Sequence, residues 1–324
     1  MNKKLLVTGD IFRPNENEGW SQTKNINVLY QLISLPLRCL GFDITLQNTS
    51  DGLSTIPFSH RQLRVNNISW ASFFYSSPSL TEVEWFSNLK RYDLIIGFEL
   101  SPFLLNIFKV LGLTYVNVFI SPIRFLAEHL FIMTSNNPTF HDRLKLLNCT
   151  EKEINRAANR IISKNIMIND NKIWPNSCII SGQTPSDRVL INSNGCFDKL
   201  QDYQDYLANL TKEFDHIYFK PHPHNKGDLP PLKNIPILDG DFYNYLSQPN
   251  LRKVVSISSS TSIESNYFGV EGVQLEEKRY SDLMHGPMIA NSIDDECFWE
   301  YVLLGSDFKS SSNFSYLPVK EIYL

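Results

Sequence analysis

The segment Lys220-Pro221-His222-Pro223 places a cation and a histidine directly after the apolar residues 217–219. The two prolines restrict the backbone on both sides of His222, so the ring sits on a rigid mount. An imidazolium held in this way can donate to a leaving phosphate group and help to neutralise it. The structural alternative is a proline turn that happens to carry a histidine.

A run of five hydroxyl residues, Ser258 to Ser262, follows the apolar residues 253–257. A helix that begins there would present unbonded backbone amides and a positive dipole end, which attract phosphate. Capping such a helix needs only one serine, so the run predicts phosphate contacts from Ser258, Ser259 and Ser260. Glu264, one turn further along, is either an acceptor for ribose hydroxyls or an acid that the helix dipole favours.

Acidic residues and an arginine follow other apolar runs. Asp187 closes the segment Gly182-Gln183-Thr184-Pro185-Ser186-Asp187. It is either a nucleophile, base or hydroxyl acceptor, or a residue that caps a helix or pairs with Arg188. Glu99 ends the run 93–98 and is a candidate general acid or base. Arg124 can hold a substrate carboxylate through two guanidinium nitrogens, or it can form a structural ion pair.

Alternating apolar runs and helical periods indicate how these residues are positioned. Strands are expected at 4–8, 42–47, 92–98, 115–120, 178–181, 216–219, 253–257 and 272–275, and helices at 25–41, 81–89, 102–111, 151–164, 241–247, 260–268 and 294–304. The helix at 81–89 is expected to be capped by Thr81, with Glu84 three residues later. This alternation is typical of doubly wound α/β domains, in which ligands bind beyond the carboxyl ends of parallel strands.

Length and composition indicate the number of domains and argue against nucleic acid, zinc and disulfides. A chain of 324 residues suits two domains, which we expect at 1–165 and 166–324, with the last helix a candidate for crossing back. The net charge of −4 provides no field for nucleic acid, so no such partner is expected. Five scattered cysteines without C-x-x-C spacing predict neither a zinc site nor a disulfide framework, in keeping with a reducing cytosol.

Hydropathy predicts a cytoplasmic protein. The apolar run at 5–7 is too short for a signal peptide, and no segment of about eighteen uncharged apolar residues is present. A peripheral association with the inner face of the cytoplasmic membrane stays open.

The motifs of the second half resemble those of bacterial CMP-ulosonic-acid glycosyltransferases, in particular the retaining β-Kdo transferases of capsule and lipopolysaccharide synthesis. The resemblance covers about residues 178–270 and rests on Gly182-Gln183 with Asp187, on Lys220-Pro221-His222-Pro223, and on Ser259-Ser260 with Glu264 and Gly269. In the first half, Gly97-Phe98-Glu99 and Pro122-Ile123-Arg124-Phe125 are compatible with it.

The resemblance implies an α/β fold of two Rossmann-like domains facing a cleft, the glycosyltransferase-B type. The first domain would bind an oligosaccharide or glycolipid acceptor, and the second would hold the donor, CMP-Kdo or a related CMP-ulosonic acid, without cofactor or metal. Implied donor contacts are Gln183, Lys220, His222, Pro223, Ser258, Ser259, Ser260 and Glu264. Asp187 would be the nucleophile, Glu99 the acid/base and His222 the partner of the leaving phosphate, while Arg124 would hold the substrate carboxylate.

Two other functions remain open at this point. An inverting sialyltransferase that uses CMP-Neu5Ac would share the His-Pro and Ser-Ser segments. It would also carry an acidic-acidic-Gly segment, which Ser50-Asp51-Gly52 and Leu238-Asp239-Gly240 match poorly. A catalytically inactive glycan-binding protein on the same fold is the second alternative. Donor hydrolysis or glycan transfer separates it from an enzyme.

Overall fold

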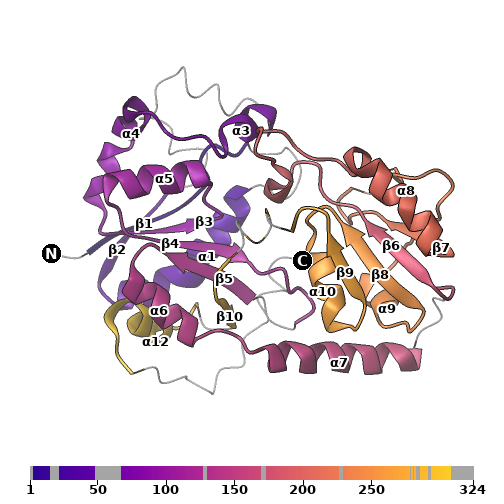
Figure 1. The fold of residues 1–324 in the computed structure, drawn as a ribbon. Helices are drawn as coiled ribbons and strands as arrows, with labels where there is room; N and C mark the ends of the chain where they lie inside the picture. The colour runs from indigo at the N-terminus through magenta and orange to yellow at the C-terminus, as the bar shows by residue number, and fades with distance from the viewer. Residues whose placement is uncertain are drawn as a thin grey trace.

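The computed structural model describes most of the chain in ten stretches. They are residues 3–14, 22–47, 67–126, 130–168, 173–225, 229–277, 279, 281, 285–290 and 293–307. The segment Ser50-Asp51-Gly52 lies outside these residues. Figure 1 shows two α/β units side by side, each built around its own sheet.

The first unit contains a six-stranded sheet in the order β10-β5-β4-β3-β1-β2. Its strands are β1 (Lys3–Gly9), β2 (Phe42–Leu46), β3 (Leu94–Phe98), β4 (Tyr115–Ile120), β5 (Leu130–Ser135) and β10 (Met288–Ala290). The first four are parallel, whereas β5 pairs antiparallel with β4 and β10 pairs antiparallel with β5. The elements around this sheet are α1 (Gln22–Cys39), α3 (Asn67–Phe73), α4 (Leu80–Trp85), η2 (Ser87–Arg91), α5 (Pro102–Leu111) and α6 (Pro138–Leu146).

The second unit contains a four-stranded, fully parallel sheet in the order β7-β6-β8-β9. Its strands are β6 (Ser177–Ser181), β7 (His216–Lys220), β8 (Leu251–Ser256) and β9 (Glu271–Gln274). Its helices are α7 (Glu151–Ile168), η3 (Arg188–Leu190), η4 (Leu200–Tyr203), α8 (Gln204–Glu213), α9 (Phe242–Leu246) and α10 (Ser260–Tyr267). The expected fold class, α/β with parallel strands in two units, is confirmed.

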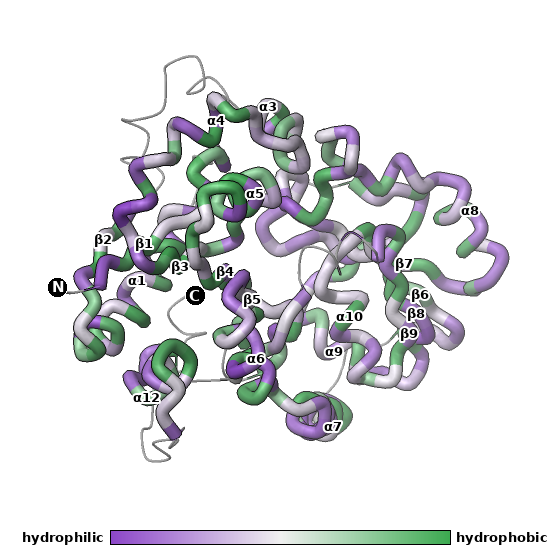
Figure 2. The backbone as a smooth tube through the Cα atoms, turned by 60° about the vertical axis from the view of Figure 1, so that its left-hand side comes forward, coloured by the Kyte–Doolittle hydropathy of each residue, from purple (hydrophilic) through white to green (hydrophobic). Residues whose placement is uncertain are grey.

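Both sheets are covered on two faces, which explains why their central strands read as continuous apolar runs. All five residues of β3 and all five of β6 are buried. Along β1, Leu5 and Val7 enter one core cluster and Leu6 enters another, as the alternation of side chains along a strand requires. In the tube of Figure 2 hydrophobic residues lie both in strands and in helices such as α5 and α12.

Two segments connect the units. Helix α7 runs unbroken across residue 165, and its buried Ile154 and Ala158 pack in a core of the second sheet. After β9 the chain returns to the first sheet as β10, followed by α12 (Glu296–Trp299) and a π-helical turn (Glu300–Leu304). Trp299 is fully buried in the same core cluster as residues of α1.

Two local expectations differ from the structure. The helix expected at 81–89 divides into α4 and η2, and its cap is Ser79 with Glu82, both partners of the capping box being present. The strands β5 and β10 were not expected. No helix among the described residues is both long and apolar enough to cross a membrane.

Candidate functional site

The carboxyl ends of strands from the two sheets meet around the segment that follows β6. Val189 and Ile191 of this segment lie in a core cluster of the first unit. The Nη2 atom of Arg188 donates to the backbone oxygen of Leu100, just beyond β3, at 3.4 Å. The residues after β3 and after β6 therefore lie together, although 88 positions separate Leu100 and Arg188 in the chain.

Glu99 follows β3 in an unusual backbone conformation. Its φ is +49°, in the left-handed region, and its backbone N–H donates to Val118 at 2.9 Å. This conformation costs a non-glycine residue about 1–2 kcal/mol, and such outliers gather at functional sites. The Oε2 atom of Glu99 lies 3.1 Å from Nη1 of Arg13, and the Arg13 guanidinium lies 5.1 Å from the ring centre of Trp70.

Asp187 lies at the start of the 3-10 turn η3, where its carboxylate accepts weakly from Val189 N–H at 3.4 Å. Burial raises the pKa of Asp187, the positive charge of Arg13 opposes this shift, and the negative charge of Glu99 adds to it. The charges of Arg13 and Glu99 therefore act on the pKa of Asp187 in opposite directions. The structure shows the cap, which uses one of the two carboxylate oxygens, and the catalytic role of Asp187 stays a prediction.

Three further charged residues belong to this group, and the sequence analysis did not assign them. Asp10, after β1, is fully buried, where it accepts from Trp70 Nε1 at 2.9 Å and from Phe12 N–H at 3.1 Å; burial raises its pKa. Arg13 follows three residues later. The place of both after the first strand was the available signal.

Arg188 is the third of these residues, and it is only 3% exposed. Its guanidinium lies 5.0 Å from the ring centre of Phe119 and 5.7 Å from that of Phe74. Among the described residues, its Nε and Nη1 atoms have no hydrogen-bond partner. Burial lowers the pKa of Arg188, while Glu99, Asp10 and Asp187 favour its charged form.

His222 lies beside the turn after β6. Its Nδ1 accepts from the backbone N–H of His224 at 3.2 Å and lies 3.4 Å from Thr184 Oγ1. Burial, with a smaller effect of His224, lowers the pKa of His222 to about 4, so the ring is neutral near pH 7. This differs from the expected imidazolium: an Nδ1 that accepts leaves the proton on Nε2, so the ring offers a neutral N–H donor.

Two neighbours of His222, Lys220 and Pro223, lie at the end of β7 and on the surface, respectively. Lys220 is the last residue of β7, and its backbone oxygen accepts from Gly182 N–H at 2.9 Å, which ties the His222 segment to the turn after β6. Pro223 is exposed.

Gln183 and Ser258 join the ends of β6 and β8. Ser258 N–H donates to Gln183 Oε1 at 2.9 Å, and Gln183 Nε2 donates to Ser258 Oγ at 3.3 Å. The Ser258 hydroxyl in turn donates to the backbone oxygen of Val189 at 3.0 Å. These hydrogen bonds position the two strand ends, and the donor contacts expected of both side chains stay predictions.

The hydroxyl run forms the start of α10. Ser259 is the N-cap, and its Oγ accepts from Thr261 N–H at 3.4 Å. The Ser262 hydroxyl lies 2.8 Å from that of Ser256, inside the unit. Ser260 is the first helical residue and is partly exposed, and Thr261 Oγ1 is buried without a partner among the described residues. The first turn of α10 thus keeps donors and hydroxyls that the fold itself does not use.

Glu264 and Arg124 lie together one turn further along α10. Glu264 is 2% exposed, and its Oε1 accepts from the backbone N–H of Arg124 at 2.5 Å and from the Tyr243 hydroxyl at 3.0 Å. Burial raises the pKa of Glu264 to about 7, against these hydrogen bonds. The carboxyl therefore links the loop after β4 to α10. The ribose contact expected of Glu264 stays a prediction.

The described residues contain no cluster of three His, Cys, Asp or Glu side chains placed to hold a metal ion. No protein-family model matches the chain, and no curated protein sequence matches it.

Similar solved structures are enzymes that transfer sugars. The chain is similar to the β-Kdo 2,7 transferase of Thermosulfurimonas dismutans KpsC, with 13% identity and a TM-score of 0.42 over 93% of this chain and 99% of that one. It is similar to the β-Kdo 2,4 transferase of the same KpsC, with 14% identity and a TM-score of 0.42 over 82% and 78%. For the spinosyn rhamnosyltransferase SpnG the identity is 10% and the TM-score 0.32, over 87% and 83%. Likenesses this weak assign no activity to the chain.

Proposed function

We propose that this chain is a retaining glycosyltransferase that moves an ulosonic acid, Kdo in the first instance, from its CMP-activated donor to a bacterial surface glycan. The observation that carries the proposal is that the segments after β3 and β6 are joined by the hydrogen bond from Arg188 to Leu100, and that the negative charge of Glu99, beside Arg13, raises the pKa of Asp187. Two carboxyl groups at one site are what a double displacement at an anomeric carbon needs.

The groups next to these two acids are suited to bind the phosphate of the donor. His222 offers a neutral Nε2–H, and the first turn of α10 offers backbone amides at the positive end of the helix dipole. The negative charge that develops on the leaving CMP is stabilised by these donors together with Lys220. No metal takes part in this proposal, so the reaction should proceed in the presence of EDTA.

The chemistry has two steps. In the first, an Asp187 oxygen bonds to the anomeric carbon while the bond from that carbon to the phosphate oxygen of CMP breaks, and CMP leaves with the electron pair. In the second, an acceptor hydroxyl oxygen attacks the same carbon, the bond to Asp187 breaks, and Glu99 takes the hydroxyl proton. Two inversions at one carbon give net retention.

The decisive experiment measures CMP release from CMP-Kdo and, separately, from CMP-Neu5Ac, followed by the anomeric configuration of the product by NMR. We expect release from CMP-Kdo, at least tenfold slower release from CMP-Neu5Ac, and retained configuration. Asp187→Asn is the matched control because it keeps the shape of the side chain without its nucleophilic charge. Inversion with CMP-Neu5Ac would favour the sialyltransferase, and glycan binding without CMP release would favour the inactive protein.

A further inference from the structure

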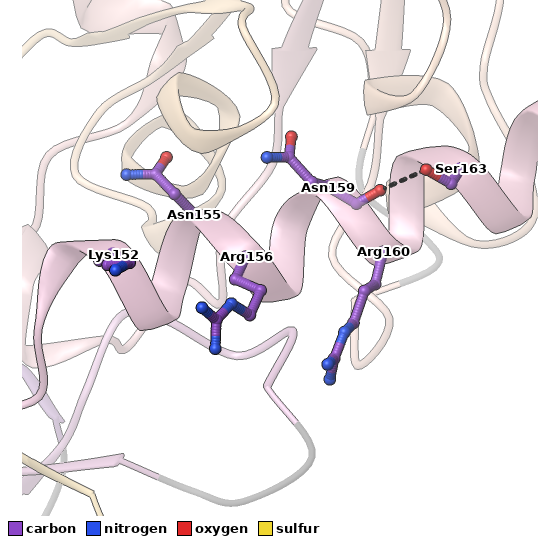
Figure 3. Close-up of a pocket in the computed structure, with 6 residues that line it drawn as sticks. All are labelled: Lys152, Asn155, Arg156, Asn159, Arg160 and Ser163. Atoms are coloured by element: carbon purple, nitrogen blue, oxygen red, sulfur yellow. Dashed lines mark hydrogen bonds between the residues drawn. The ribbon is translucent and has the colours of Figure 1, made fainter.

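The outward face of α7 carries a row of cations. Lys152, Arg156, Arg160 and Lys164 are exposed and recur at every fourth position, so they lie along one side of the helix. A shallow hollow runs along this face. It is lined by Lys152, Asn155, Arg156, Asn159, Arg160 and Ser163. In Figure 3 the side chains of Arg156 and Arg160 extend from the helix in the same direction.

The positive charge of this row is not balanced along most of the helix. Among the described residues, no salt bridge involves any of the four cations, whereas ion pairs are present elsewhere on the chain. The acidic residues of α7, Glu151 and Glu153, both lie in its first turn. Glu153 is held there by hydrogen bonds from Thr150, so the remaining four turns or so present a single sign of charge.

The same face ends in exposed apolar side chains. Ile166 is 65% exposed and Met167 is 85% exposed. At 100° per residue, Met167 projects between the directions of Arg156 and Arg160, and Ile166 projects between those of Asn155 and Asn159. The core contacts of α7 lie on its other side, at Ile154 and Ala158. Figure 2, which views α7 nearly end-on, shows hydrophilic and hydrophobic residues on different sides of it.

We propose that this face of α7 docks the protein onto a bilayer that contains anionic lipids. The row of cations would contact the lipid phosphates, while Ile166 and Met167 would enter the boundary between headgroups and acyl chains. A helix of 18 residues is about 27 Å long, so it offers several headgroup contacts when it lies flat. A soluble polyanion would use the cations but not the apolar end, which is why a membrane surface fits better. The inference does not depend on the proposed activity.

The test is sedimentation of the full chain with vesicles of phosphatidylcholine alone or with about 30% phosphatidylglycerol. We expect binding only to the anionic vesicles, and less of it at 0.5 M salt. Arg156→Glu with Arg160→Glu should weaken the partition coefficient by about 30-fold or more, given what each basic residue contributes near an anionic surface. Lys90→Glu with Lys109→Glu, exposed positions in the first unit, makes the same change in charge and should leave binding unchanged.

A second pair of variants examines the apolar end. Ile166→Ser with Met167→Ser should weaken binding to anionic vesicles at constant charge, and Met167→Trp should show quenching of its fluorescence by brominated lipids. Thermal unfolding of each variant confirms that the fold is retained, as expected for exposed positions. The proposal is overturned by equal binding to both vesicle types, by no vesicle binding, by wild-type binding of the α7 charge variant, or by binding of a soluble polyanion alone.

Discussion

Arg13 and Glu99 form an ion pair in which Nη1 lies 3.1 Å from Oε2, and both side chains are largely buried, with 24% and 16% of their surface exposed. The pair joins the loop after β1 to the end of β3, and its charges act on Asp187 from the other sheet. Arg13 therefore pairs with Glu99 and, together with Arg188, opposes the rise in the pKa of Asp187. This arrangement distinguishes the two carboxyl groups, because Glu99 has a charged partner, whereas the hydrogen bond seen for Asp187 among the described residues is a weak one from the backbone N–H of Val189.

The first prediction separates the roles of the two acids. Glu99→Gln should slow transfer by about 10²–10⁴-fold, because the acceptor hydroxyl loses its base, and it should let a sugar adduct accumulate on Asp187. Asp187→Asn should slow transfer at least as much and form no adduct. Intact-protein mass spectrometry after mixing with CMP-Kdo measures the adduct. An adduct on the Asp187→Asn protein would show that the nucleophile is another residue.

The second prediction concerns Arg13. Because burial raises the pKa of Asp187 and Arg13 opposes that shift, Arg13→Gln should raise this pKa further. The acid limb of the pH profile of kcat/KM should therefore move to higher pH, since Asp187 must be ionised to attack. Arg38→Gln, on the exposed end of α1, is the control and should leave the profile unchanged. If the acid limb of Arg13→Gln is not shifted, the ionisation that this limb reports is not that of Asp187.

The third prediction concerns Glu264 and His222, which oppose each other in the pH dependence of stability. The pKa of Glu264 rises from 4.5 to about 7, so only the folded state keeps its proton between these values, and stability falls as the pH rises through this window. The pKa of His222 falls from 6.5 to about 4, so the unfolded state holds the extra proton, and stability rises between pH 4 and 6.5.

Removing either group should therefore reveal the effect of the other on the pH dependence of stability. Between pH 4.5 and 6.5, Glu264→Gln should make the unfolding free energy rise more steeply than in wild type, and His222→Gln should make it fall, each by up to about 1.4 kcal/mol per pH unit. Urea unfolding at pH 4.5, 5.5 and 6.5 measures this, with the exposed Glu84→Gln as control. Parallel curves for all the variants would show that these two groups are not perturbed.

The fourth prediction concerns Gly272, where β9 passes under the first turn of α10. A Cβ atom at this position would lie 1.6 Å from the backbone oxygen of Ser262, so the helix must move. Gly272→Ala should lower the unfolding free energy by about 1–3 kcal/mol and weaken CMP binding, because the displaced turn carries the donors that we propose for the CMP phosphate. Thermal unfolding and calorimetric titration with CMP measure the two effects.

Glu271→Ala, at the neighbouring position, is the control for Gly272→Ala. It removes only the exposed side of an ion pair with Lys253 at 3.4 Å, which contributes less than about 1 kcal/mol. Equal losses in the two variants would mean that the close approach of β9 to α10 does not position the helix start.

Local chemistry was enough to predict many elements from the sequence. The bounds of α5 and β4 agree with those expected, because Pro102 begins the helix, Gly112 ends it in a left-handed conformation, and a continuous apolar run marks the strand. The cap of α4 was misplaced by two residues, since both Ser79 and Thr81 are followed three positions later by an acid. The three-residue strand β10 could not be predicted, because it forms by pairing with β5 and with Asn148, both about 140 or more positions earlier in the chain.

The sequence by itself determined which polar residues follow buried strands, and parallel strands must bring such residues to one edge of each sheet. Only the tertiary structure decided what each of them does there. It pairs Glu99 with Arg13, and it joins the ends of β6 and β8 by a hydrogen bond between Gln183 and Ser258. It also buries the carboxyl group of Glu264. It also makes His222 neutral, because the loss of water around a buried ring outweighs its preference for a proton. Solvation and contacts between distant strand ends are properties of the packed molecule, and no local stretch of sequence contains them.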